Sequence, residues 1–122
     1  MSEAKRIEVF HYPKCSTCRK ALKWLDEQGI EHTRIDIVEH PPSKTKLAKA
    51  KQLAGVELRK LFNTSGQSYK AGNWKDKLGT ISEADALAAL AADGKLIKRP
   101  LLLADGVALI GFKPDEWAEK LG

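Results

Sequence analysis

Hydrophobic and polar residues follow two different patterns in the first third of the chain. The apolar, β-branched stretch within residues 6–11 predicts a short strand that ends at the following proline. Residues 17–28 carry apolar side chains at helical spacing and predict a helix that stops at Gly29. Residues 33–38 alternate polar with apolar side chains before a proline pair and predict a second strand. A strand, a helix and a strand in this order predict two parallel strands joined by a right-handed crossover.

The middle of the chain is predominantly helical by the same criteria. Residues 43–54 predict a helix that is capped by its first serine and ended by Gly55. Residues 57–62 predict another short helix, whereas residues 63–79 are rich in Gly, Ser and Asn and are expected to be irregular. A capping-box pattern opens a further helix over residues 82–92.

The last third of the chain predicts a β-hairpin followed by a helix. Asp105-Gly106 is a turn signal between the apolar runs 101–103 and 107–110, and a final helix is expected from about 114 to 121. Together the elements predict an α/β fold with a thioredoxin- or glutaredoxin-like sheet. The helical segment at about 43–92 is inserted into this sheet topology.

Length and composition narrow the class of protein. A chain of 122 residues has the length of one domain, so we expect a single domain over 1–122. No stretch of about 18 apolar residues is present, so no membrane span is expected. The first six residues lack the apolar core of a signal peptide, which predicts a cytoplasmic protein. The net charge is +5, but the lysines accompany no nucleic-acid-binding motif, so we expect no direct nucleic-acid binding. We also expect the protein to be a monomer.

The two cysteines form a C-x-x-C motif, Cys15-Ser16-Thr17-Cys18, between the first predicted strand and its helix. Unpaired backbone N–H groups at a helix N-terminus favour an anion, so a thiol placed there ionises more readily. Cys15 is nearer the helix start and is our candidate nucleophile, with Lys14 and Arg19 adding positive charge around it. Cys18, one turn further in, is the candidate resolving thiol that would close an internal disulfide. Both cysteines are therefore expected to serve catalysis or redox sensing.

The same motif could supply part of a metal site. Two thiolates provide half of a tetrahedral zinc site, but there is no second C-x-x-C and the histidines at 11, 32 and 40 form no paired motif. We therefore expect no metal and no bound cofactor. A thiol–metal binding module stays an alternative only if a partner chain donates the missing ligands.

Four sequence segments carry a resemblance to a known family. They are Tyr12-Pro13-Lys14-Cys15-Ser16-Thr17-Cys18-Arg19-Lys20, Leu58-Arg59-Lys60-Leu61-Phe62-Asn63-Thr64-Ser65-Gly66, Ile97-Lys98-Arg99-Pro100 and Gly111-Phe112-Lys113-Pro114. With these segments the chain resembles the arsenate reductase (ArsC) and Spx family over nearly its whole length. The branch it resembles most is the small, C-x-x-C-containing, arsenate reductase-like group. The resemblance implies a thioredoxin fold with a helical insertion.

The resemblance also implies candidate substrate-binding residues. In the family's arsenate reductases, one cysteine and three arginines bind and reduce the oxyanion. Arg59 and Arg99 match the first two arginines, whereas the segment that matches the third holds Lys113 and no arginine. Pro100 matches a proline that lies opposite the cysteines and is cis in proteins of this kind. Cys18 stands where glutaredoxin-dependent arsenate reductases typically have serine, which favours a dithiol oxidoreductase.

The cysteine motif and the family resemblance together suggest two functions. The preferred one is a cytosolic thiol–disulfide oxidoreductase that reduces protein disulfides or arsenate through Cys15, with thioredoxin or glutaredoxin and glutathione as the reductant. The alternative is a Spx-type redox-sensing transcriptional regulator that binds RNA polymerase, in which the same cysteine pair senses oxidation without turning over a substrate.

Overall fold

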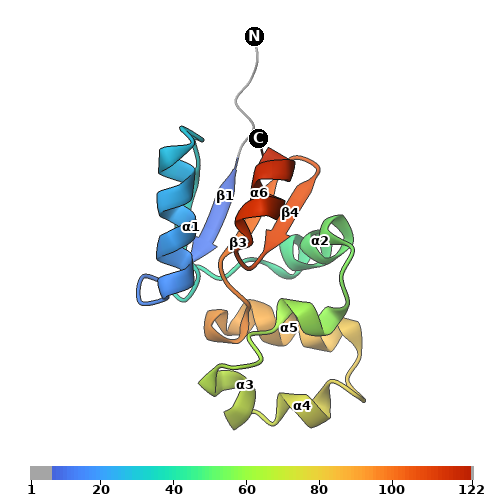
Figure 1. The fold of residues 1–122 in the computed structure, drawn as a ribbon. Helices are drawn as coiled ribbons and strands as arrows, with labels where there is room; N and C mark the ends of the chain where they lie inside the picture. Colours follow the sequence, from blue (N-terminus) through green and yellow to red (C-terminus); the bar gives the residue numbers. More distant parts are fainter. Residues whose placement is uncertain (1–6, 122) are drawn as a thin grey trace.

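Four short strands form the sheet of the structure, a computed structural model that describes residues 7–121 (Figure 1). The strands are β1 (Glu8–His11), β2 (Thr33–Asp36), β3 (Leu101–Ala104) and β4 (Val107–Ile110), in the order β2-β1-β3-β4. β1 and β2 are parallel, as predicted, and the other two pairs are antiparallel. The predicted hairpin is therefore confirmed, and β4 lies at one edge of the sheet. Residues 1–6, on which the expectation about a signal peptide rests, lie outside the described residues.

Helices cover both faces of this sheet. The longer helices are α1 (Ser16–Glu27), α2 (Lys44–Ala54), α5 (Glu83–Ala92) and α6 (Pro114–Leu121), and the shorter ones are η1 (Leu58–Leu61), α3 (Gln67–Ala71), α4 (Trp74–Lys77) and η2 (Gly94–Leu96). Figure 1 shows α3, α4 and α5 gathered beyond the end of the sheet toward which β1 runs. No helix within residues 7–121 combines the length and the apolar character that crossing a bilayer requires.

Alternation along the strands divides the core into two parts. Val9, Leu102 and Leu109 lie in register across the sheet and pack with α1 and with Trp117 of α6. Phe10 and Leu101, one residue along, belong to the other cluster, which contains α2, α5 and the short inserted helices. Side chains in a strand point alternately to opposite faces, so these few strand residues separate the two layers.

Helix ends follow the predicted capping, whereas two other segments differ from the sequence expectation. Ser43 and Ser82 each accept the backbone N–H three residues later, which satisfies a first-turn donor. β2 ends at Asp36, not at residue 38, because the Asp36 carboxylate accepts the N–H groups of Val38 and Glu39 and turns the chain. Residues 63–79, expected to be irregular, contain α3 and α4.

The aromatic residues of this segment explain its two short helices. The rings of Tyr69 and Trp74 pack against Phe62 with centroid separations of 6.1 and 5.2 Å. Aromatic contacts of this kind bury large areas and stabilise a segment whose local sequence favours turns.

A close backbone approach joins the helical insertion to the sheet at Gly94. A Cβ atom at this position would lie 1.8 Å from the carbonyl oxygen of Ile37 and 2.6 Å from its carbonyl carbon. Only glycine allows the start of η2 to lie against the end of the β2 segment.

We predict that Gly94→Ala lowers the free energy of unfolding by about 2–3 kcal/mol or more, because the new methyl group meets backbone that cannot move alone. Gly79→Ala is the matched control, since its nearest atom would be at an ordinary contact distance of 3.5 Å. The control should stay within about 0.5 kcal/mol of the parent. Urea unfolding followed by circular dichroism measures both, and equal losses in the two variants would contradict the close-approach argument.

Candidate active site

Four chain segments that are distant in sequence meet at the end of β1. They are the loop 12–15, the segment 63–65 after η1, the residues 98–100 before β3 and the residues 111–113 after β4. An isolated antiparallel bridge between Phe62 and Ile97 joins the second segment to the third. The Asn63 N–H donates to the Leu96 carbonyl, and the Lys98 N–H donates to the Leu61 carbonyl, both at 2.8 Å.

Gly111 fixes the fourth segment to the third. Its N–H donates to the Pro100 carbonyl at 2.9 Å, and its carbonyl accepts the indole N–H of Trp117 at 3.1 Å. Trp117 is fully buried and packs edge-on against Phe112. With φ at +77°, Gly111 makes the sharp turn that glycine adopts without strain.

Cys15 occupies the N-cap position of α1, as predicted for the candidate nucleophile. Its backbone is extended, with φ −92° and ψ 118°, and its Sγ accepts the backbone N–H of Cys18 at 3.4 Å. The Cys15 N–H donates to the Tyr12 carbonyl at 2.9 Å, which holds the residue directly below the end of β1. The half-buried sulfur is thus placed where an N-cap side chain normally satisfies a first-turn donor.

The surroundings of Cys15 favour its thiolate. Burial raises the pKa of the thiol, but the backbone N–H and the thiol of Cys18, together with the Arg99 guanidinium, oppose burial and hold the pKa below its ordinary value. Hydrogen-bond donors and a positive charge stabilise the anion more than its protonated form. The lowered pKa of Cys15 therefore has its causes in Cys18 and Arg99, and not in Lys14 or Arg19, from which the sequence led us to expect a contribution.

Cys18 lies in the opposite environment, one turn along the same helix. Its side chain is fully buried, and its Sγ accepts the Tyr12 N–H at 3.5 Å. Burial and the neighbouring Cys15 outweigh that hydrogen bond and raise the pKa of the Cys18 thiol to about 12. At neutral pH this sulfur is a protonated thiol that can donate its S–H to the Cys15 thiolate.

Arg99 is held beside the cysteine pair by two contacts. Its guanidinium lies 4.8 Å from the centre of the Tyr12 ring, and its Nη1 donates to the Lys95 carbonyl at 3.3 Å. The Arg99–Pro100 peptide bond is cis and Pro100 is buried, so the isomer expected from the resemblance is present. Arg99 thus lies next to the candidate nucleophile, where the resemblance placed it.

A pocket of about 340 Å³ opens beside Cys15. It is lined by Cys15, Thr17, Asn63, Ser65, Lys98, Arg99, Ile110, Gly111, Phe112 and Lys113. Three cationic side chains, those of Lys98, Arg99 and Lys113, therefore share a pocket with the thiolate. An anionic group would be attracted to these three cations and would therefore be held beside the Cys15 sulfur.

Other candidate residues lie away from this pocket. Arg59 is on η1 with an exposed side chain and is not among the lining residues, and its role as a substrate ligand stays a prediction. Lys14 and Arg19 are exposed beside the motif but do not line the pocket either. Within residues 7–121, no group of three or more His, Cys, Asp or Glu is arranged to hold a metal ion.

The sequence alone did not assign Lys98, Asn63 or Ser65 to the site. Lys98 directly precedes the Arg99-Pro100 pair, and Asn63 and Ser65 lie in a polar turn that follows a short helix. Its position next to Arg99 in the sequence could have indicated that Lys98 lies at the site. Asn63 and Ser65 belong to one of the four segments that carry the family resemblance, but no local pattern shows the long-range bridge between Phe62 and Ile97 that brings this segment to the site.

The chain is similar to known proteins over nearly its whole length. The sequence pattern of the ArsC family matches residues 10–120. The uncharacterized protein YusI of Bacillus subtilis is 49% identical over 93% of this chain and 96% of its own length. The regulatory protein MgsR of the same organism is 27% identical over 92% of this chain and 87% of its own length.

Two solved structures show the same fold over nearly the full length. A protein of Bacteroides fragilis described as ArsC family related has a TM-score of 0.90 and 44% identity, covering 96% of this chain and 98% of its own. An arsenate reductase from Vibrio cholerae has a TM-score of 0.86 and 33% identity, covering 98% of this chain and 100% of its own. These likenesses confirm the predicted α/β, thioredoxin-like fold with its helical insertion. On the sequence pattern, the relatives and the shared fold, this chain belongs to the ArsC family.

Proposed function

We propose that this protein is a cytosolic thiol–disulfide oxidoreductase in which Cys15 is the attacking thiolate and Cys18 is the resolving thiol. The observation that carries the proposal is the contrast between two sulfurs on one helical turn. Cys15 accepts the first-turn N–H of Cys18 and has a lowered pKa, whereas Cys18 is fully buried with a pKa raised to about 12. In such a pair the more accessible, ionised sulfur serves as the nucleophile and the buried, protonated sulfur serves as the resolving thiol.

The first step is an exchange at sulfur. The Cys15 thiolate attacks one sulfur of a substrate disulfide, the S–S bond of the substrate breaks, and the departing thiolate takes a proton from solvent. A mixed disulfide between Cys15 and the substrate is then present. Arg99 positions an anionic or hydrogen-bonding part of the substrate next to the reacting sulfur.

The second step closes the internal disulfide. Cys18 loses its proton and attacks the Cys15 Sγ, and the remaining substrate sulfur leaves as a thiol, so that two electrons pass from the protein to the substrate. Loss of the negative charge on Cys15 removes one cause of the raised Cys18 pKa, but burial, the largest cause, remains. A thioredoxin, or glutaredoxin with glutathione, reduces the internal disulfide and completes the cycle.

Arsenate is a second candidate substrate, favoured by the cations around Cys15. Lys98, Arg99 and Lys113 line the pocket, and the relative from Vibrio cholerae is named an arsenate reductase. Reduction of As(V) to As(III) takes the same two electrons that formation of the Cys15–Cys18 disulfide supplies. Against this substrate stands the presence of a single forked guanidinium in the pocket, because lysine does not replace arginine at a bidentate anion site.

The alternative function is that of a Spx-type redox-sensing regulator that contacts RNA polymerase. The likeness to MgsR, which is named a regulatory protein, favours it. The same cysteine chemistry would then act once per oxidation event without repeated turnover. Turnover measurements separate this candidate from the enzyme.

Replacement of each cysteine in turn tests the assigned roles. We predict that Cys18→Ser accumulates a stable mixed disulfide with glutathione at Cys15 after exposure to glutathione disulfide, because the resolving thiol is missing. Cys15→Ser, the matched variant, should stay unmodified because Cys18 is buried and protonated. Intact-mass and peptide-mass spectrometry identify the modified sulfur. A mixed disulfide at Cys18 in the Cys15→Ser protein would reverse the assignment.

The effect of Arg99 on Cys15 can be measured through the pH dependence of alkylation. A lowered pKa means that the thiolate of Cys15 is already populated at pH values where an ordinary thiol is still protonated. Arg99→Gln removes a hydrogen bond and a positive charge, so the midpoint of the iodoacetamide rate profile should move to higher pH and the rate at pH 7 should fall about three- to tenfold. Lys23→Gln, which removes an exposed positive charge further along α1, is the control and should leave the profile in place. Identical profiles for parent and Arg99→Gln would show that Arg99 does not stabilise the thiolate.

An enzyme and a sensor differ in the number of electrons they pass per protein molecule. We predict that NADPH oxidation, coupled through thioredoxin reductase and thioredoxin, continues for many equivalents with a protein disulfide as substrate and stops in Cys15→Ser. Arsenate in place of the disulfide should give a slower rate because only Arg99 provides a forked donor. Consumption of a single equivalent followed by arrest, with either substrate, would favour the sensor.

A further inference from the structure

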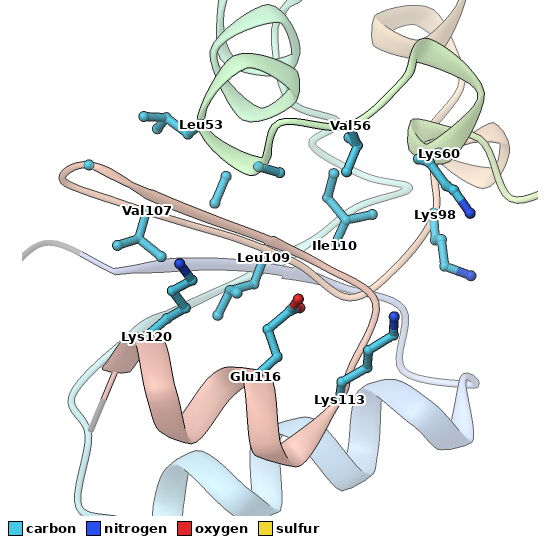
Figure 2. A pocket seen from close by; sticks show the side chains of 13 residues that line it. Leu53, Val56, Lys60, Lys98, Val107, Leu109, Ile110, Lys113, Glu116 and Lys120 are labelled. Atoms are coloured by element: carbon cyan, nitrogen blue, oxygen red, sulfur yellow. The ribbon is translucent and has the colours of Figure 1, made fainter.

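The free edge of the sheet lies at the bottom of a groove. A hollow of about 400 Å³ runs along β4 and is lined by that whole strand together with Leu53, Val56, Lys60, Lys98, Lys113 and Lys120. Figure 2 shows β4 between two walls, with Leu53 and Val56 on the side of α2 and with Lys113, Glu116 and Lys120 on the side of α6. The groove is apolar at its base and cationic along its rims.

The edge strand offers unused backbone groups to this groove. In an antiparallel ladder, hydrogen-bonded pairs alternate with non-bonded pairs. The bond from the Gly111 N–H to Pro100 therefore places Leu109 and Val107 in bonded pairs with β3 and turns the N–H and C=O of Ala108 and Ile110 outward. No hydrogen bond within residues 7–121 joins these outward groups to a partner outside the ladder.

The charges around the groove are predominantly of one sign. Lys60, Lys98, Lys113 and Lys120 face it with a single carboxylate, that of Glu116. The ion pairs of the described chain involve other residues, namely Arg34 with Asp26, Lys46 with Glu8 and Lys51 with Glu83. The four lysines are therefore available to an acidic partner.

We propose that the groove along β4 binds an acidic, extended segment of a partner polypeptide, which pairs with Ala108 and Ile110 as an additional strand. Main-chain hydrogen bonds to an exposed sheet edge give such complexes their affinity, and the flanking side chains give their specificity. Here the four lysines select carboxylates, and the apolar base accepts alternating aliphatic side chains. Binding in the groove does not itself use the cysteines of the proposed function, although the groove adjoins their pocket.

The lysines around the groove fit neither protection of the sheet edge nor a contact between two copies of the chain. Lysine often protects an edge strand from aggregation, but in that role it usually stands on the strand itself. β4 consists of Val107-Ala108-Leu109-Ile110, so no charged side chain of the strand itself opposes pairing at its edge. A second copy of this chain would bring both sets of lysines together, which electrostatic repulsion disfavours.

The groove also adjoins the candidate active site. Lys98, Ile110 and Lys113 line both the groove and the pocket beside Cys15. A segment seated on β4 would reach the thiolate at the end nearest Lys113. The groove thus offers a docking place for a protein substrate or a protein reductant of acidic character.

A peptide of about eight residues that alternates glutamate with valine is the probe, long enough to cover the edge strand. We expect the fluorescently labelled peptide to bind the reduced full chain at low salt, with a clear loss of affinity at high salt. Lys60→Glu with Lys120→Glu should weaken binding about tenfold or more, since two favourable charge contacts become repulsive. Lys20→Glu with Lys23→Glu, on the exposed face of α1, makes the same change in net charge and should leave the affinity unaltered. A peptide that alternates lysine with valine should not bind.

Amide hydrogen exchange measured by NMR distinguishes strand addition from simple charge attraction. The glutamate–valine peptide should slow exchange at Ala108 and Ile110, while Val107 and Leu109 stay protected with or without it. No binding of the peptide, or binding that ignores the groove lysines or leaves the two edge amides unprotected, would overturn the proposal. Concentration-dependent dimerisation that protects the same amides without peptide would also overturn it, because the occupant would be a second copy. Cys15→Ser should bind the peptide like the parent, so a failure of the redox proposal leaves this test intact.

Discussion

The start of helix α1 directly after the end of β1 is the constraint on which the site depends. β1 is hydrogen-bonded on both sides, to β2 and to β3, so the position of its last residues is fixed by the sheet. The Tyr12 carbonyl then accepts the Cys15 N–H, and the helix begins where the sheet places it. Because unpaired N–H groups in the first turn seek an acceptor, the Cys15 sulfur is stabilised as an anion by the backbone itself.

One helix creates opposite environments for its two cysteines. Cys15 lies at the N-cap, at the boundary of solvent, while Cys18 continues the inward stripe that Ala21, Leu22 and Leu25 form. The difference arises because Cys15 is the extended N-cap residue at the helix end, whereas Cys18 lies within the first turn, on the face that α1 buries. The chemical asymmetry of the pair is thus a consequence of helix geometry and needs only Arg99 as an additional cation.

Much of the fold could be predicted from the sequence because its signals are local. The apolar stripe of α1, the serine caps at 43 and 82 and the Asp105-Gly106 turn each determine their own element. The end of β2 could not be predicted, since it depends on the Asp36 side chain competing for backbone N–H groups. The helices within 63–79 depend on contacts with Phe62, and long-range contacts leave no periodic trace in the sequence.

The clustering of positive charge around the groove could not be predicted from the sequence either. Along the chain the lysines are spread among acidic residues, which is typical of solvated helix faces and gives no reason to suspect a binding surface. The groove draws its lysines from three separate segments, with Lys60 on η1, Lys98 before β3, and Lys113 and Lys120 at the two ends of α6. They line one groove only because β4 lies between α2 and α6. A surface of this kind is a property of the tertiary structure alone. It also explains how a protein with a modest net charge of +5 can present one strongly cationic face next to its reactive sulfur.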